Sequence, residues 1–230
     1  MTLTRPQIPA EDLREIPMYH LPEVARYLHL PTSTLRDWVE GRDGRSPASA
    51  IITRPSDRDP RLSFNNLVEA HVLRALRHEH KISMQAVRRA LEDAQARFGI
   101  KRLLIDKKLL AAPGEMFLRE YGRLLSLTKL NQLAMEEILQ RFLRRLVRDV
   151  EGLPIRLYPF VAPGFSDDRR VITIDPRLSY GRPSLVSKGV STAILGERVN
   201  AGETIKELAD YYGLDEQDVK EAVIYEGFAA

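Results

Sequence analysis

The sequence predicts a mainly α-helical protein with small β elements, that is, an α+β chain. Three observations support this class: apolar residues at helical spacing in residues 19–41, short apolar runs between turn residues in the middle, and a second pair of capped helices near the C-terminus. We expect a winged helix-turn-helix in residues 1–98, a strand and helix connector in 99–150, and a small C-terminal helix-turn-helix domain in 151–230.

Residues 19–41 predict two short helices joined by a tight turn. Leu30-Pro31 ends the first helix, and the Thr32 hydroxyl can cap the second, whose first N–H groups lack internal partners. A generic helical hairpin has the same pattern. In a DNA-binding helix-turn-helix, the first residues of the second helix approach base edges and phosphates. Each helix has an apolar stripe, formed by Val24, Ala25, Leu28, Leu35 and Val39.

The candidate DNA contacts lie on the second helix and in the segment that follows it. We expect polar side chains near the start of this helix to face outward. Residues 41–62 contain glycines, prolines and five arginines, and the β-branched run at 51–53 predicts a small wing. The candidate contacts are Thr32, Ser33, Thr34, Arg36, Asp37, Arg42 and Arg54.

Two further helices follow. One opens at residues 62–69 with Ser63 as its cap, and another opens at 82–88. The segments 33–38, 62–69 and 82–91, in this order and spacing, resemble the MerR-type winged-helix DNA-binding domain. The resemblance covers about residues 17–98. The long dimerisation helix and effector-binding cysteines of many MerR regulators are absent. Because the chain has no cysteine, redox sensing and thiolate metal ligation are excluded.

The charge of the chain is distributed unevenly. Residues 191–230 contain three basic and nine acidic side chains and carry a charge of −6. Because the net charge of the chain is +3, the other residues together carry +9. Residues 71–108 are rich in arginine and lysine. Such a run can be a solvated helix face, but beside a helix-turn-helix we favour a surface that follows phosphates.

The connector combines short strands with one long helix. Apolar runs at 103–105, 116–118 and 123–127 predict strands, and 129–150 predicts an amphipathic helix. Its apolar stripe can pack on the neighbouring strands, which we favour, or on a second copy of the helix. Basic side chains crowd its second half, namely Arg141, Arg144, Arg145 and Arg148.

The C-terminal region predicts strands at 155–160 and 171–174. Residues 171–226 then resemble a small domain of unknown function that is common in prokaryotic antitoxins encoded beside PIN-type ribonuclease toxins. Where members of that family usually carry Thr-Arg-Ile, this chain has Val-Ser-Thr at 190–192. The matching positions are Asp175, Pro176, Gly181, Pro183, Gly189, Ile194, Gly202, Leu208, Ala209, Tyr212, Leu214, Val219, Ala222 and Tyr225.

A second helix-turn-helix is predicted at 204–212 and 215–225. Gly213 suits the end of the first helix, and Asp215 with Asp218 suits the start of the second. Acidic side chains repel phosphates, so we interpret this unit as a protein-contact or self-association surface. The second helix is expected to expose Glu216, Gln217, Asp218 and Glu221.

A DNA-binding domain followed by the small domain at residues 171–226 resembles the larger VapB-like antitoxins, in which one protein represses its own operon and binds the toxin. The resemblance implies double-stranded operator DNA, a PIN-type ribonuclease and a second copy of the chain as partners. An arginine or blocking segment could disable the nuclease's carboxylate and metal site, and an acidic helix could occupy its RNA groove as a phosphate mimic. The candidate toxin contacts are Arg141, Arg144, Arg145, Arg148, Glu216, Asp218 and Glu221.

The alternative is a MerR-like regulator whose C-terminal half binds a ligand or a partner other than a toxin. An enzyme is not expected, because there is no phosphate-binding glycine loop and no nucleophile motif. His78 and His80 would point apart on a helix, so we expect neither a metal nor a cofactor. Without a signal peptide or long apolar run, we expect a cytoplasmic, nucleoid-associated protein.

Overall fold

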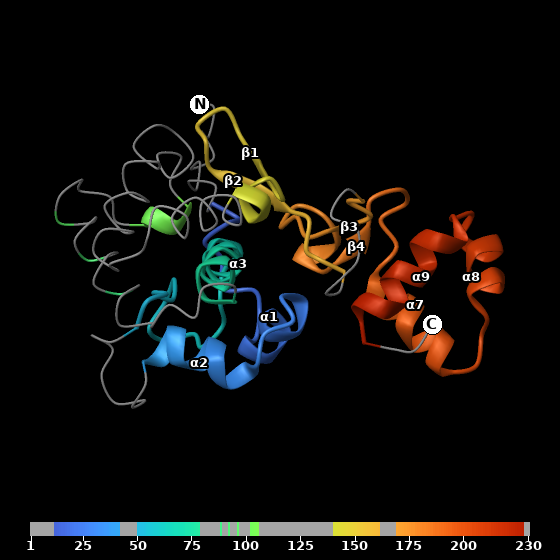
Figure 1. The fold of residues 1–230 in the computed structure, drawn as a ribbon, viewed down its shortest axis with the longest axis horizontal. Coiled ribbons are helices and arrows are strands. Elements are labelled where there is room, and N and C mark those ends of the chain that lie inside the picture. The colour runs from blue at the N-terminus through green and yellow to red at the C-terminus, as the bar shows by residue number, and fades with distance from the viewer. Residues whose placement is uncertain are drawn as a thin grey trace, which may run out of the picture.

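The computed structural model describes residues 12–41, 50–78, 102–105, 140–161 and 169–227, with the single positions 88, 92 and 96. Helices α1 (Leu21–Tyr27), α2 (Thr32–Glu40) and α3 (Phe64–His78) form the N-terminal helical unit. In Figure 1, α3 lies between α2 and the strands β1 (Leu146–Arg148) and β2 (Pro154–Leu157). The predicted mixture of helices and small sheets is confirmed.

The C-terminal unit follows from β3 (Ile172–Thr173) onward. β3 pairs with β4 (Ser184–Leu185), and the helices α7 (Thr192–Asn200), α8 (Ile205–Tyr212) and α9 (Glu216–Tyr225) come next. Figure 1 shows β3 and β4 between the N-terminal unit and these helices. Within the described ranges, no helix is both long enough and apolar enough to cross a membrane.

The first two helices have the predicted order but not the predicted cap. The backbone N–H of His20 donates to Glu23 Oε2 (2.7 Å) at the start of α1, and His29 adopts a left-handed φ of 48° after its end. Pro31 occupies the N-cap of α2 and makes no side-chain cap bond. The prediction for Thr32 as the cap is therefore wrong, because proline already occupies that position with a φ of −59° and ψ of 131°.

The cap of α3 is confirmed. The Asn66 N–H donates to Ser63 Oγ (3.3 Å), and the Ser63 N–H donates to Asn66 Oδ1 (3.1 Å). The Asn66 side-chain amide also donates to the carbonyl of Thr53 (2.8 Å). This second contact fixes the segment between α2 and α3.

The β-branched run at 51–53, which was expected to belong to a small wing or hairpin, does not form a strand. The N–H groups of Ile51 and Ile52 both donate to the carbonyl of Trp38 (2.8 and 3.0 Å), so the chain bends around the end of α2. In residues 50–62 the β contact is a single bridge between Leu62 and Tyr19. Residues 42–49, the rest of the expected wing, lie outside the described residues.

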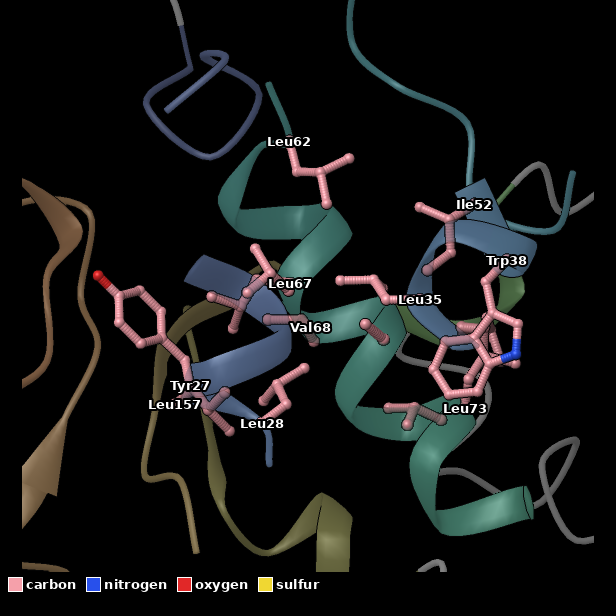
Figure 2. Close-up of a cluster of buried hydrophobic side chains, with 14 of the residues drawn as sticks. Tyr27, Leu28, Leu35, Trp38, Ile52, Leu62, Leu67, Val68, Leu73 and Leu157 are labelled. Atoms are coloured by element: carbon pink, nitrogen blue, oxygen red, sulfur yellow. The ribbon is translucent and has the colours of Figure 1, made fainter. Parts of the chain in front are cut away.

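A large apolar cluster holds α1, α2 and α3 together (Figure 2). Trp38 and Leu35 from α2 point toward α3, and Ile52 covers the end of α2. Leu157 of β2 belongs to the same cluster, as do Phe160 and Ile174. The core of the N-terminal unit therefore continues across the expected boundary at residue 150.

Two predictions for the connector are wrong. Residues Leu103–Ile105 form a short 3-10 helix, not a strand, with the Ile105 N–H donating to the carbonyl of Arg102 (3.2 Å). The helix expected through residue 150 ends at Leu143, and β1 begins at Leu146 because that segment pairs antiparallel with β2. The segments at 82–87, 116–118, 123–127 and 129–139 lie outside the described residues.

The apolar stripe of this connector helix packs within the chain where it is described. Phe142 and Leu143 are both buried in the large apolar cluster. The Phe142 ring lies 5.0 Å from the ring of His71 and 4.7 Å from that of Phe160. Phe142 belongs to the predicted stripe, and for this residue the favoured alternative, packing within the chain, is confirmed.

The helices predicted at 204–212 and 215–225 form α8 and α9, and the predicted strands form over shorter stretches as β2 and β3, whereas β4 and α7 were not predicted. Leu157 and Ile174 exchange two backbone hydrogen bonds (2.9 and 2.8 Å), which link β2 to β3. The Thr204 hydroxyl caps α8, and Gly213 ends it with a left-handed φ of 63°. Asp215 caps α9 by accepting from the Gln217 N–H (2.8 Å).

The two units meet at α1. The Tyr225 hydroxyl donates to the carbonyl of Tyr27 (2.9 Å), and the ring of His29 lies edge-on to that of Tyr225 at 5.2 Å. Arg26 forms an ion pair with Glu226. These contacts attach the last helix of the chain to the first helix of the helix-turn-helix.

Candidate nucleic-acid interface and partner-binding faces

Helix α2 separates a buried face from an exposed one. Leu35, Trp38 and Val39 are buried in the core, whereas Ser33 and Arg36 are exposed. This separation follows from the helical period, which places positions three and four residues apart on one face. Ser33 and Arg36 therefore point away from the core.

The remaining candidates on α2 are less accessible. Thr32 and Asp37 are partly exposed. Thr34 is only 8 % exposed, so the expectation that it faces outward is wrong. The reason is its position four residues before Trp38, because residues i and i+4 lie on the same face of a helix and Trp38 faces the core.

Two predicted DNA-contacting arginines are brought together by one carboxylate. Arg36 Nε lies 4.0 Å from Glu40 Oε2, and Arg54 Nη2 lies 3.8 Å from Glu40 Oε1. These are long, solvent-exposed ion pairs, which contribute little stability and are readily exchanged for other partners. Both guanidinium groups can therefore turn toward phosphates. Arg42 lies outside the described residues.

Part of the arginine-rich stretch at 71–108 serves the fold. Arg102 forms two hydrogen bonds with the buried carboxylate of Glu69 (2.7 and 2.9 Å) and an ion pair with Glu15. The guanidinium of Arg74 lies 5.9 Å from the ring centre of Phe160. A role in following phosphates is therefore unsuited to Arg102 and Arg74, whereas Arg77 is exposed on α3.

The four arginines expected in the second half of one long helix do not all lie in a helix. Arg141 and Arg144 are exposed, whereas Arg145 is buried and donates to the carbonyl of Arg169 (3.2 Å). Arg148 lies in β1 and donates to the carbonyls of Ile105 (3.0 Å) and Gly152 (2.7 Å). Because the helix ends at Leu143, the helical period does not extend to Arg148.

The acidic helix α9 is less exposed than expected. Glu221 is 3 % exposed, and its Oε1 accepts from Arg169 Nη1 (2.8 Å), so the expectation of an exposed Glu221 is wrong. Asp218 also pairs with Arg169, at 2.5 Å, and does not complete a capping arrangement with Asp215. Burial raises the pKa of Asp218 more than Arg169 lowers it. Glu216 is exposed and remains accessible to a partner.

The sequence patterns did not identify the residues that join distant segments. Arg169 pairs with α9 across about fifty positions, and Tyr225 and Glu226 contact α1. Such contacts leave no periodic signal in the chain. The one available signal was the aromatic residue Tyr225, which matched the C-terminal domain pattern.

The described histidines support no metal site. His71 is fully buried, with Nε2 at 3.0 Å from the carbonyl of Phe142. Burial lowers the pKa of His71 to about 3, so the ring is neutral at pH 7. In the described part of the chain, no group of three histidine, cysteine or acidic side chains is placed to hold a metal ion.

Comparison with known families separates the same two regions. Residues 17–91 match the family described as "Putative DNA-binding HTH domain". Residues 172–225 match the family described as "Protein of unknown function (DUF433)". The first match contains α1, α2 and α3, and the second runs from β3 to the end of α9.

Full-length relatives come from Mycobacterium tuberculosis (strain ATCC 25618 / H37Rv). The chain is 29% identical to the "Putative antitoxin VapB45", over 91% of this chain and 93% of that protein. It is 25% identical to the "Uncharacterized protein Rv2308", over 92% and 90% of the two chains. The crystal structure of Rv2018 from M. tuberculosis superposes with a TM-score of 0.70 at 26% identity, covering 90% of this chain and 98% of that one.

Proposed function

We propose that this protein is the antitoxin of a type II toxin–antitoxin pair. It binds operator DNA as a homodimer through a MerR-like, winged helix-turn-helix, represses its own operon and neutralises a PIN-type ribonuclease by direct binding. The observation that carries the DNA-binding part is the geometry of α2, which buries Leu35 and Trp38 and exposes Ser33 and Arg36. The similarity to a named antitoxin along most of the chain supports the toxin-binding part.

Arg36→Ala tests the assignment of α2 as the recognition helix, which contacts base edges in the major groove. We expect it to weaken binding to a duplex from the promoter of its own gene by about 1–3 kcal/mol, the usual cost of losing an arginine contact to a base. Binding by the unaltered protein should also fall steeply with added salt, because arginines displace counterions from phosphates. Fluorescence anisotropy at several salt concentrations measures both effects.

Lys220→Ala is the control for this experiment. It removes one positive charge from an exposed position on α9, far along the chain from α2. Equal losses in the two variants would mean that only net charge matters and that α2 does not contact the bases.

A dimer should bind a palindromic duplex more tightly than either half-site alone, since one short recognition helix covers only a half-site.

For toxin binding, we propose the exposed acidic positions of α8 and α9. Asp210 and Glu216 are both exposed, whereas Glu221 is engaged with Arg169 inside the unit. A ribonuclease needs a basic groove for RNA, so acidic groups at its entrance would steer the two proteins together. Arg141 and Arg144 are exposed and remain candidates for the same partner.

Reversing these two acidic charges tests the steering. We expect Asp210→Lys with Glu216→Lys to slow association with the toxin encoded beside this gene, mainly through the on-rate, and to leave operator affinity unchanged or slightly higher. Stopped-flow mixing measures the rate. The opposite pair, Lys206→Glu with Lys220→Glu, lies on the same two helices and should accelerate association. If neither pair changes the association rate, the acidic helices do not face the toxin. The alternative function, a regulator that binds a ligand or a partner other than a toxin, is then favoured.

A further inference from the structure

The loop between β3 and β4 has an unusual backbone. Ser179, Tyr180 and Gly181 are three consecutive residues in left-handed conformations, with φ of 49°, 54° and 71°. Residues other than glycine adopt this conformation at a cost and hold it where the surroundings impose it, often at functional sites. The Tyr180 side chain is 90 % exposed, so burial of its ring does not compensate for this cost.

A buried carboxylate fixes the base of this loop. Asp175 is 1 % exposed and accepts hydrogen bonds from Arg177 Nη2 (2.7 Å) and Arg156 Nε (3.2 Å). Burial alone would raise the pKa of Asp175, but the hydrogen bonds and positive charges of these arginines outweigh it and hold the pKa below its usual value. The carboxylate therefore stays ionised and keeps the loop in place at neutral pH.

The far side of the loop is attached to the helix-turn-helix. The Tyr19 hydroxyl donates to the carbonyl of Gly181 (3.0 Å), and a Cβ atom on Gly181 would lie 2.2 Å from that hydroxyl oxygen. Tyr19 directly precedes His20, the N-cap of α1. Arg182 directly follows Gly181 in the chain, so its backbone lies next to this attachment to α1.

The loop has a small positive charge in an otherwise acidic unit. Residues 174–183 contain Arg177 and Arg182 against one acidic residue, Asp175, whereas 197–226 contain nine acidic and three basic residues. The Arg182 side chain is exposed and forms no hydrogen bond or ion pair with any residue that the structure describes. The Arg182 end of the loop therefore lies beside α1, where Glu226 is already paired with Arg26, and most of the other acidic residues lie on or next to α7, α8 and α9.

We propose that residues 177–182 form an additional contact to the phosphate backbone of duplex DNA, beside the groove that α2 enters. Arg182 would pair with a phosphate, and the Tyr180 hydroxyl would donate to a phosphate or sugar oxygen, as tyrosine does in many protein–DNA complexes. Arg177 stays paired with Asp175 and holds the loop in shape. The first helix of a helix-turn-helix crosses the DNA backbone, and this loop is attached at the start of that helix. The inference rests on the proposed DNA-binding function and extends it to the C-terminal unit.

The test uses the full chain and a duplex from the promoter of its own gene. Arg182→Gln removes the free charge, and Tyr180→Asn removes the ring while keeping a residue that tolerates left-handed backbone. We expect each variant to bind about threefold to tenfold more weakly, and Arg182→Gln to reduce the slope of log affinity against log salt by about one. A phosphate contact should affect promoter and unrelated duplexes alike, whereas a base contact by α2 should not.

Lys206→Gln is the matched control, because it removes the same charge from an exposed position on α8 in the acidic part of the unit. Thermal unfolding of each variant confirms that the fold is retained, and Arg182→Gln alters only an exposed side chain. If the unaltered chain binds DNA and both loop variants match Lys206→Gln, this inference is overturned and the proposed function stands. If the unaltered chain binds no DNA, both fail. If the variants lose only toxin neutralisation, the loop is a protein contact and the inference is likewise overturned.

Discussion

Trp38→Ala is expected to lower the free energy of unfolding by about 3–5 kcal/mol, the usual cost of removing a large buried aromatic side chain. Trp38 is 1 % exposed and lies at the centre of the contact between α2, α3 and the segment at 51–52 (Figure 2). Loss of this side chain leaves a cavity behind α2, the helix that we propose as the DNA recognition helix. Urea unfolding followed by circular dichroism measures the change, and operator affinity should fall with it.

The control for this variant is Trp38→Phe. Phenylalanine keeps most of the ring volume and removes the indole N–H, for which the described residues offer no acceptor. We therefore expect a much smaller loss of stability, with operator binding retained. Similar losses for Trp38→Phe and Trp38→Ala would show that the cavity is not the main cost and that the core packing described above is wrong.

Gly181→Ala is expected to cost about 2–4 kcal/mol, from overpacking and a left-handed backbone together. The new Cβ would lie 2.2 Å from the Tyr19 hydroxyl oxygen and 2.5 Å from Met18 Sδ. The Met18 side chain can move, but Tyr19 is 2 % exposed and its ring is held by the core. The substitution therefore strains the attachment of the C-terminal unit to the start of α1.

Gly189→Ala separates the two contributions. Gly189 has nearly the same φ, +69°, but a Cβ there meets nothing within 4 Å. We expect this variant to lose only the backbone contribution, about 1 kcal/mol. Thermal unfolding of the two variants side by side gives the cost of the close approach. Equal midpoints would refute the tight contact between Gly181 and Tyr19.

The predictions that succeeded depend on interactions within a few residues. Ser63 caps α3, Asp215 caps α9, and Gly213 ends α8 in a left-handed conformation. Unsatisfied backbone groups at a helix end take partners from adjacent residues, so the sequence alone identifies them. The exposed Ser33 and Arg36 on α2 likewise followed from the helical period.

The predictions that failed depend on partners far along the chain. Residues 146–148 continue an amphipathic pattern, yet they form a strand because residues 154–157 are available to pair with them. Ile51 and Ile52 favour a strand by composition, but Trp38 accepts their hydrogen bonds instead. Intrinsic preferences of about 1 kcal/mol or less per residue are overridden by such tertiary contacts.

The sequence by itself determined the two helix-turn-helix segments, the caps of α3 and α9, the apolar face of α2 and the separation of basic and acidic regions. These depend on local hydrogen bonding, helical period and composition, which are all readable along the chain. Only the tertiary structure decided that Glu221 and Arg145 are buried, that Tyr225 and Glu226 hold α1, and that the basic loop at 177–182 lies beside the helix-turn-helix. The physical reason is that burial and ion pairing depend on which distant segments meet, and a one-dimensional pattern does not contain that information.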